Sequence, residues 1–120
     1  FGDYVPRKVS LLDKLRLVPL SLTAYTDENM QVLNLVQAMI GAISPNLRRV
    51  ALAVAAPEKV RLTFVLERDE AADREEIEDI AFEFEALQTR GIDLEVNIVT
   101  DARPISEITL PGRVVFGRKE

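Results

Sequence analysis

Residues 69–88, DEAADREEIEDIAFEFEALQ, are the stretch of the sequence that decides the fold. At about 100° per residue, its apolar side chains recur at spacings of three and four and form one stripe. The stripe consists of Ile77, Ile80, Ala81, Phe84 and Leu87. Acidic residues occupy the opposite side. The segment is therefore predicted to be an amphipathic helix whose apolar stripe needs a core to cover it.

Negative charge is concentrated in and just before this helix. Residues 67–85 hold ten acidic side chains against two arginines, a local charge of −8, while the other 101 residues sum to +3 and return the chain's −5. The helix dipole favours acidic residues in a first turn, but here they continue well beyond it. The acidity is a local patch that needs another explanation.

One aromatic residue lies on the acidic side of the predicted helix. Phe82 has Glu78, Asp79 and Glu85 among its neighbours one turn away. For a single residue, the ordinary explanation is a solvated helix face, or an aromatic ring under a loop or in a homodimer seam. For the patch as a whole we favour a hot spot for a basic partner. The candidate partner-binding residues are Glu75, Glu78, Asp79, Phe82, Glu83 and Glu85.

The 120-residue chain contains neither Cys nor His. Without Cys there is no disulfide or thiolate metal site, as is typical of a reducing cytoplasmic compartment. Without His the commonest general base and transition-metal ligand are gone. The net negative charge argues against nucleic acid or an anionic membrane as partner. We therefore expect a cytoplasmic binding protein that is not an enzyme and holds no cofactor or metal.

Residues 1–29 differ from the rest, because their short apolar pieces are broken by Pro6 and Pro19. We predict an irregular N-terminal extension or leader there, followed by a single α+β domain over residues 30–120. Edge-strand fragments on either side of Pro19, or a short amphipathic helix over residues 9–18, are the alternatives within the extension.

The first regular element is predicted to be a helix with Thr26 or Asp27 as its N-cap. It continues to Ile43 and stops before Pro45, which disfavours helical dihedrals in the preceding residue. Nothing in residues 29–47 carries a charge. A helix of this kind should be covered on most sides, either by the sheet and the N-terminal segment or by a second copy in a homodimer.

Alternation with period two predicts four strands. They cover residues 48–55, 59–67, 92–98 and 113–117, and the first two form a hairpin. Polar residues on the second strand indicate that only one sheet face is buried. The predicted fold is α+β with αββαββ order, in which two helices pack on one face of a four-stranded, mostly antiparallel sheet. The basic residues Arg48, Arg49 and Arg61 are interpreted as internal balance for the acidic helix or as protection of a sheet edge.

Three segments resemble a group of small bacterial proteins. They are MQVLNLVQAMIGAISPNLRRV at residues 30–50, VRLTFVLERDEAADREEIEDIAFEFEAL at 60–87 and LPGRVVFGRKE at 110–120. The group is that of immunity proteins of contact-dependent growth inhibition and related polymorphic-toxin systems. The resemblance covers about three quarters of the chain and excludes residues 1–29. It implies a cytosolic antidote that binds the toxin domain of a delivered effector, often a nuclease, and blocks its active site or an essential surface.

Both lines of reasoning allow one partner, a basic toxin domain. An acidic helix face with an aromatic side chain can mimic the phosphates that a nuclease cleft binds. The first alternative is a homo-oligomeric scaffold or interaction module built on the uncharged helix. The second is a Mg²⁺ or Ca²⁺ site, for which we name Glu75, Glu78, Asp79 and Glu83. We disfavour it because hard-cation sites need ligands that converge from several elements.

Overall fold

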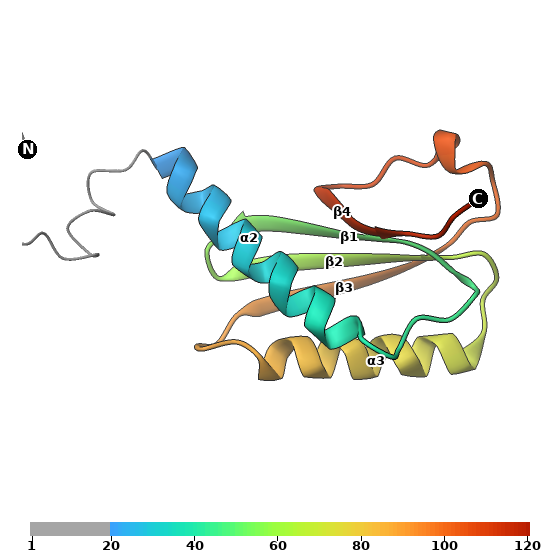
Figure 1. Cartoon of the computed structure of the whole chain (residues 1–120), viewed down its shortest axis with the longest axis horizontal. Helices are drawn as coiled ribbons and strands as arrows, with labels where there is room; N and C mark the ends of the chain where they lie inside the picture. Colours follow the sequence, from blue (N-terminus) through green and yellow to red (C-terminus); the bar gives the residue numbers. More distant parts are fainter. Residues whose placement is uncertain (1–19) are drawn as a thin grey trace, which may run out of the picture.

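The computed structural model describes the backbone of residues 20–120 and the side chains of residues 27–120. The elements are α2 (Leu20–Met39), β1 (Leu47–Ala56), β2 (Lys59–Leu66), α3 (Ala71–Ala86), β3 (Asp93–Thr100), the 3-10 helix η1 (Ile105–Glu107) and β4 (Arg113–Gly117), as Figure 1 shows. This order confirms the predicted α+β fold with αββαββ order.

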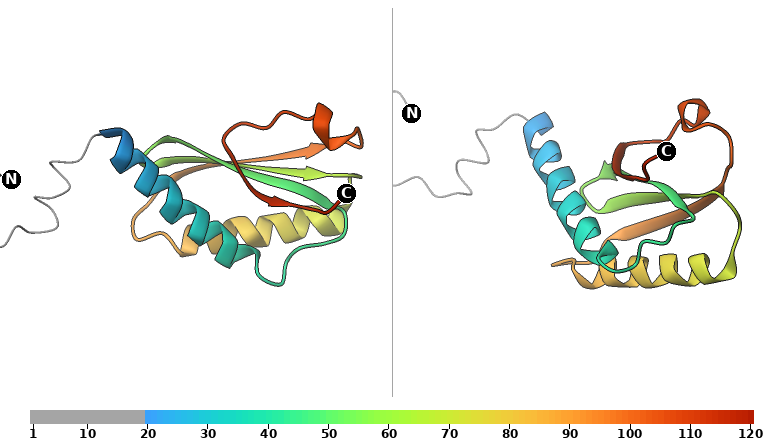
Figure 2. Two further views of the ribbon diagram at one scale, coloured as in Figure 1. Left: turned by 45° about the horizontal axis from the view of Figure 1, so that its top comes forward. Right: turned by 45° about the vertical axis from the view of Figure 1, so that its right-hand side comes forward.

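The four strands form one mixed sheet in the order β3-β2-β1-β4. Strand β1 pairs antiparallel with β2 and with β4, whereas β2 and β3 are parallel. The prediction of a mostly antiparallel sheet is therefore confirmed. The parallel pair arises because α3 carries the chain back along the sheet before β3 begins, as in a βαβ unit (Figure 2).

One hydrophobic core joins both helices to one face of the sheet. Alternate residues of β1 and β2 supply the sheet side, since successive side chains of a strand point to opposite faces. The buried members are Leu35, Ala38 and Met39 of α2, Leu47, Val50 and Leu52 of β1, Val60, Leu62, Phe64 and Leu66 of β2, and Ile77, Ile80 and Phe84 of α3. The predicted apolar stripe of α3 thus contacts the core.

The other sheet face is also covered in its middle, contrary to the expectation of a single buried face. Ala51 and Val65 are fully buried there, and Thr63 is 4% exposed. The cause is topological. Strands β3 and β4 are opposite edges of the sheet, so the connection between them, residues 101–112, has to pass from one edge to the other, and Ile105, Ile108 and Leu110 of this connection lie beside Arg49 on the face that the helices leave free.

Helix α2 begins earlier than predicted. It starts at Leu20, so Thr26 and Asp27 lie inside the helix and the N-cap prediction is wrong. The edge-strand fragment predicted after Pro19 is helical instead. Proline is common just at a helix start, and no Gly or Pro interrupts the sequence that follows. The alternatives for residues 1–19 lie outside the described residues. The division of the chain at residue 29 stays a prediction, and α2 runs continuously across it.

Helix α2 also ends earlier than predicted. Its last residue is Met39 rather than Ile43. Gly41 adopts a positive φ of 79°, the left-handed conformation that commonly closes a helix. The stop signal is therefore this glycine and not Pro45. It leaves Ile40 and the residues after it free to form one wall of a groove beside α3.

Candidate partner-binding surface

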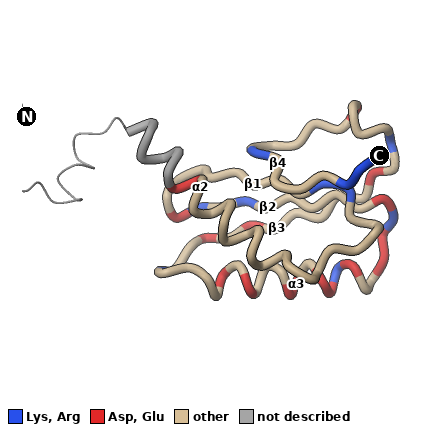
Figure 3. The backbone as a smooth tube through the Cα atoms, viewed as in Figure 1, with Lys and Arg blue, Asp and Glu red and all other residues tan. Residues whose placement is uncertain are grey.

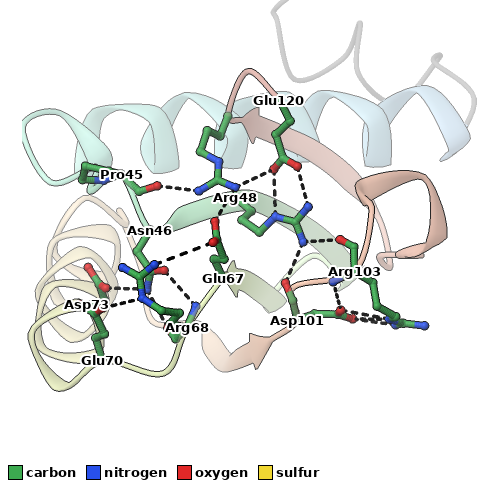
Figure 4. A network of polar contacts seen from close by, with 11 residues as sticks. Pro45, Asn46, Arg48, Glu67, Arg68, Glu70, Asp73, Asp101, Arg103 and Glu120 are labelled. Atoms are coloured by element: carbon green, nitrogen blue, oxygen red, sulfur yellow. Dashed lines mark hydrogen bonds and ion pairs between the residues drawn. The ribbon is translucent and has the colours of Figure 1, made fainter.

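The start of α3 is held by a buried side-chain contact. Asn46, the residue before β1, donates to Oδ2 of Asp73 at 2.8 Å and to the carbonyl oxygen of Arg68 at 2.7 Å. Its own Oδ1 accepts from the backbone N–H of Arg68 at 2.9 Å. Figure 4 shows these contacts. Asp73 is only 8% exposed, so its carboxylate depends on this amide.

The other end of α3 is tied to α2. Gln31 and Gln88 exchange two side-chain hydrogen bonds, of 2.9 and 2.8 Å. The Nε2 of Gln88 also donates to the carbonyl oxygen of Phe84 at 3.2 Å. Because α3 is fixed at both ends, the surface that it turns away from the core is held in place relative to α2.

That outward surface carries all six candidate residues, and we call it the acidic face. It consists of Glu75, Glu78, Asp79, Phe82, Glu83 and Glu85, and every one of them is exposed. Phe82 is 75% exposed, so it is neither under a described loop nor part of the core. Within residues 27–120, no Lys or Arg forms an ion pair with any of the five carboxylates. Figure 3 shows the acidic positions recurring along α3.

Two of the three basic residues that were expected to balance this helix, Arg48 and Arg61, bind elsewhere. Arg48 donates to both oxygens of Glu120, at 2.9 and 2.6 Å, and to the carbonyl oxygens of Asp101 and Arg103, each at 2.7 Å (Figure 4). Arg61 pairs with a β3 residue, Glu95, at 2.9 Å. Arg49 forms no ion pair with a described residue. The interpretation of these arginines as balance for the acidic helix is therefore wrong.

A groove with a volume of about 340 Å³ lies between the end of α2 and the middle of α3. The α2 side is apolar and consists of Ala38, Ile40, Gly41 and Ala42. The α3 side is apolar at its base and acidic around it, and it consists of Glu76, Asp79, Ile80, Phe82 and Glu83. The groove can accept an apolar side chain, and its acidic wall favours a neighbouring positive charge.

The groove divides the acidic face into two parts. Asp79, Phe82 and Glu83 line it, whereas Glu75, Glu78 and Glu85 lie outside it. Sequence reasoning missed Glu76, which is half-buried and lines the groove from α3. Its sequence signal was its place at the border between the apolar stripe and the acidic side. The α2 residues of the groove were missed because their proximity to α3 depends on the tertiary structure.

Helix α2 and the residue that follows it expose an apolar line that we call the α2 stripe, made of Met30, Leu33, Val36 and Ile40. These side chains are 54%, 62%, 44% and 77% exposed. They lie opposite the buried residues Leu35, Ala38 and Met39 on the helix. Within the described residues the helix is covered on one side only, and its coverage elsewhere by the N-terminal segment or by a second copy stays a prediction. Ile40 belongs to both the stripe and the groove.

In the described part of the chain, no three acidic residues are grouped so that they could hold a metal ion, so the Mg²⁺ or Ca²⁺ alternative gains no support from the geometry. None of the helices in the described residues has both the length and the apolarity that a membrane span requires.

Fold and surface together define a small α+β domain that exposes an acidic and apolar surface along its two helices. The model of the MafI2 immunity protein family matches residues 28–120, and the chain belongs to this family. The match confirms the predicted resemblance to immunity proteins of polymorphic-toxin systems. No curated protein matches the chain.

Proposed function

We propose that this chain is a non-enzymatic inhibitor that binds the toxin domain of a cognate bacterial effector through the acidic face of α3. Membership of an immunity protein family supports a toxin as the partner. The observation that carries the assignment of the surface is the set of five exposed carboxylates around Phe82, none of which has an ion-pair partner within residues 27–120.

The charge of this surface favours a basic toxin domain, and a nuclease is the class that fits best. A nuclease cleft presents Lys and Arg side chains to the phosphates of its substrate, and a row of carboxylates on a rigid helix presents the same sign of charge to that cleft. Complementary charge accelerates the encounter and disfavours wrong partners, while a desolvated aromatic residue adds affinity at the centre. In this proposal the chain binds neither nucleic acid nor a membrane, and it inhibits the toxin in the cytoplasm.

The first test is capture from the native host. The tagged chain is used as bait at low and moderate salt, and retained proteins are identified by mass spectrometry. We expect one basic protein fragment that arrests growth when it is expressed alone and does not when the chain is co-expressed. Failure of co-expression to restore growth, for every captured protein, contradicts the proposal.

A second candidate function is a self-assembling module, and one observation favours it. The α2 stripe exposes four large apolar side chains along residues 29–40, which carry no charge, and this is a common feature of homodimer seams. Light scattering at micromolar concentration separates the two functions. If the chain is a defined dimer that captures no toxin, the self-assembling module is supported. If it is a monomer that protects cells from the toxin, the self-assembling module is excluded.

A further inference from the structure

The acidic face alone is small for a stable protein interface. Helix α3 has 16 residues, so it is about 24 Å long and about 10 Å wide, which gives its outward side roughly 250 Å². A specific complex of standard size buries about 800 Å² on each partner. A toxin domain that sits on α3 must therefore also cover a neighbouring part of the surface.

The groove and the α2 stripe are the neighbouring surface that continues the acidic face without a break. Phe82 of α3 and Ile40 after α2 line the same groove and are among the most exposed large apolar side chains of the described residues, at 75% and 77%. From Ile40 the stripe runs back along α2 to Met30, over about 15 Å. Within residues 27–120, no charged residue interrupts it, and Figure 3 shows this length of α2 without acidic or basic positions.

We infer that the groove between α2 and α3 receives an apolar side chain of the toxin domain, that flanking Lys or Arg residues of the toxin bind Glu76, Asp79 and Glu83, and that the α2 stripe extends this interface. The inference rests on the proposed function, because it takes the partner to be that toxin. It adds a second helix to the binding surface and a specific chemistry for the segment that docks there, an apolar residue beside basic ones.

Charge decides between this occupant and a second copy of the chain. The groove is acidic on its α3 side, and Ile40 joins it directly to the stripe. A copy that docked on the stripe would bring its own acidic groove and α3 to the same region, where like charges oppose association. A basic segment complements the acidic wall and covers the apolar side chains at the same time.

The two methionines of the chain supply a direct test on the full-length protein. Met30 lies in the stripe and is 54% exposed, whereas Met39 lies in the core and is 4% exposed. Mild peroxide should oxidise Met30 in the free protein and spare Met39, which serves as the internal control. Addition of the purified toxin domain that the chain captures should slow the oxidation of Met30 by at least about tenfold, measured by peptide mass spectrometry.

Paired variants locate the effect. Leu33→Gln combined with Ile40→Gln should weaken the Kd for that toxin domain by at least about tenfold, because both side chains lie in the contact. Val99→Gln is the matched control, since Val99 is an exposed apolar residue on the sheet face opposite the helices. Its Kd should equal that of the wild type. Urea unfolding should show equal stability for all three proteins.

The outcomes distinguish this inference from the proposed function. If the complex forms while Met30 stays reactive, the inference is overturned. The same holds if the double variant binds like the wild type while Phe82→Ala binds weakly. In both cases the proposed binding of the toxin by α3 still stands. Binding that neither set of changes affects overturns both. Protection of Met30 in the free protein also overturns the inference, in favour of a second copy if the protection rises with concentration and of the chain's own N-terminal segment if it does not.

Discussion

The two charged regions of the molecule differ in what their charges contact. Around Arg48, whose side chain is 4% exposed, a carboxylate and two carbonyl oxygens accept its hydrogen bonds. On the acidic face, five carboxylates surround Phe82 without an ion-pair partner in the described part of the chain. Charges that are satisfied internally stabilise the fold, whereas unpaired charges of one sign repel each other and remain available to a partner. Changes in the first region should therefore affect stability, and changes in the second should affect binding.

The largest expected effect is on stability. Arg48→Met removes the donor for Glu120 and for the carbonyl oxygens of Asp101 and Arg103, and we expect a loss of about 3 kcal/mol in the free energy of unfolding, because these groups lose a buried charged partner. Urea denaturation measures it. Arg90→Met, at an exposed site, is the control and should cost less than about 0.5 kcal/mol. Equal stability of the two variants would show that the buried contacts of Arg48 do not stabilise the fold more than an exposed charge does.

The next effect is on binding alone. Phe82→Ala should weaken the Kd for the captured toxin domain by about 2 kcal/mol, which is roughly thirtyfold, while the free energy of unfolding changes little. Phe84, two residues further along the same helix, is fully buried, and Phe84→Ala should instead cost about 3 kcal/mol of stability. Titration calorimetry and urea unfolding measure the two quantities. A Phe82 variant that is as unstable as the Phe84 variant would show that the exposed ring belongs to the fold.

The pH dependence of stability should come from the paired region. Hydrogen bonds from the Arg103 side chain and backbone lower the pKa of Asp101 from 3.8 to about 2. Since its pKa is depressed in the folded state, its stabilisation is complete above the unfolded pKa and is lost as the pH falls through the folded pKa, between about pH 5 and pH 1. Asp101→Asn should therefore be less stable than wild type at pH 7, and the difference should shrink as the pH falls and vanish only below about pH 2. Parallel curves of urea midpoint against pH for both proteins would contradict this.

The smallest expected effect is a change in the free energy of unfolding when single carboxylates in or just before α3 are neutralised, and its sign differs between two nearby positions. Asp79→Asn removes repulsion from Glu75 and Glu83, each one turn away, and should raise the free energy of unfolding by about 0.5 kcal/mol at low salt. Asp69→Asn breaks an exposed pair with Arg74 and should lower it slightly. Salt should reduce both differences. A loss of stability in the Asp79 variant would mean that its carboxylate has a partner within the chain.

Much of the fold could be predicted from the sequence because its signals are local. The apolar stripe of α3 and the alternation in the strands depend on spacing alone, and both were right. The end of α2 was misjudged although its signal was also local, because Gly41 closes the helix before Pro45 can. The parallel pairing of β3 is a consequence of the crossover through α3, which the order of elements allows but does not require.

Of the candidate site, only the part on α3 could be predicted from the sequence. The periodicity of α3 places six residues on an outward face, and the structure exposes all six. The groove with α2 depends on how two helices cross, and no residue spacing within either helix contains that information. The partner of Arg48 was missed for the same reason, since Glu120 is 72 positions away in the chain.

The most direct test of toxin binding by the acidic face is the Kd of the captured toxin domain for the wild type and for a variant with Glu78→Lys, Asp79→Lys and Glu85→Lys, at low and moderate salt. We predict that the variant binds at least about tenfold more weakly at low salt and that the difference shrinks as salt screens the charges. An unchanged Kd with an unchanged salt dependence would contradict the assignment of this surface.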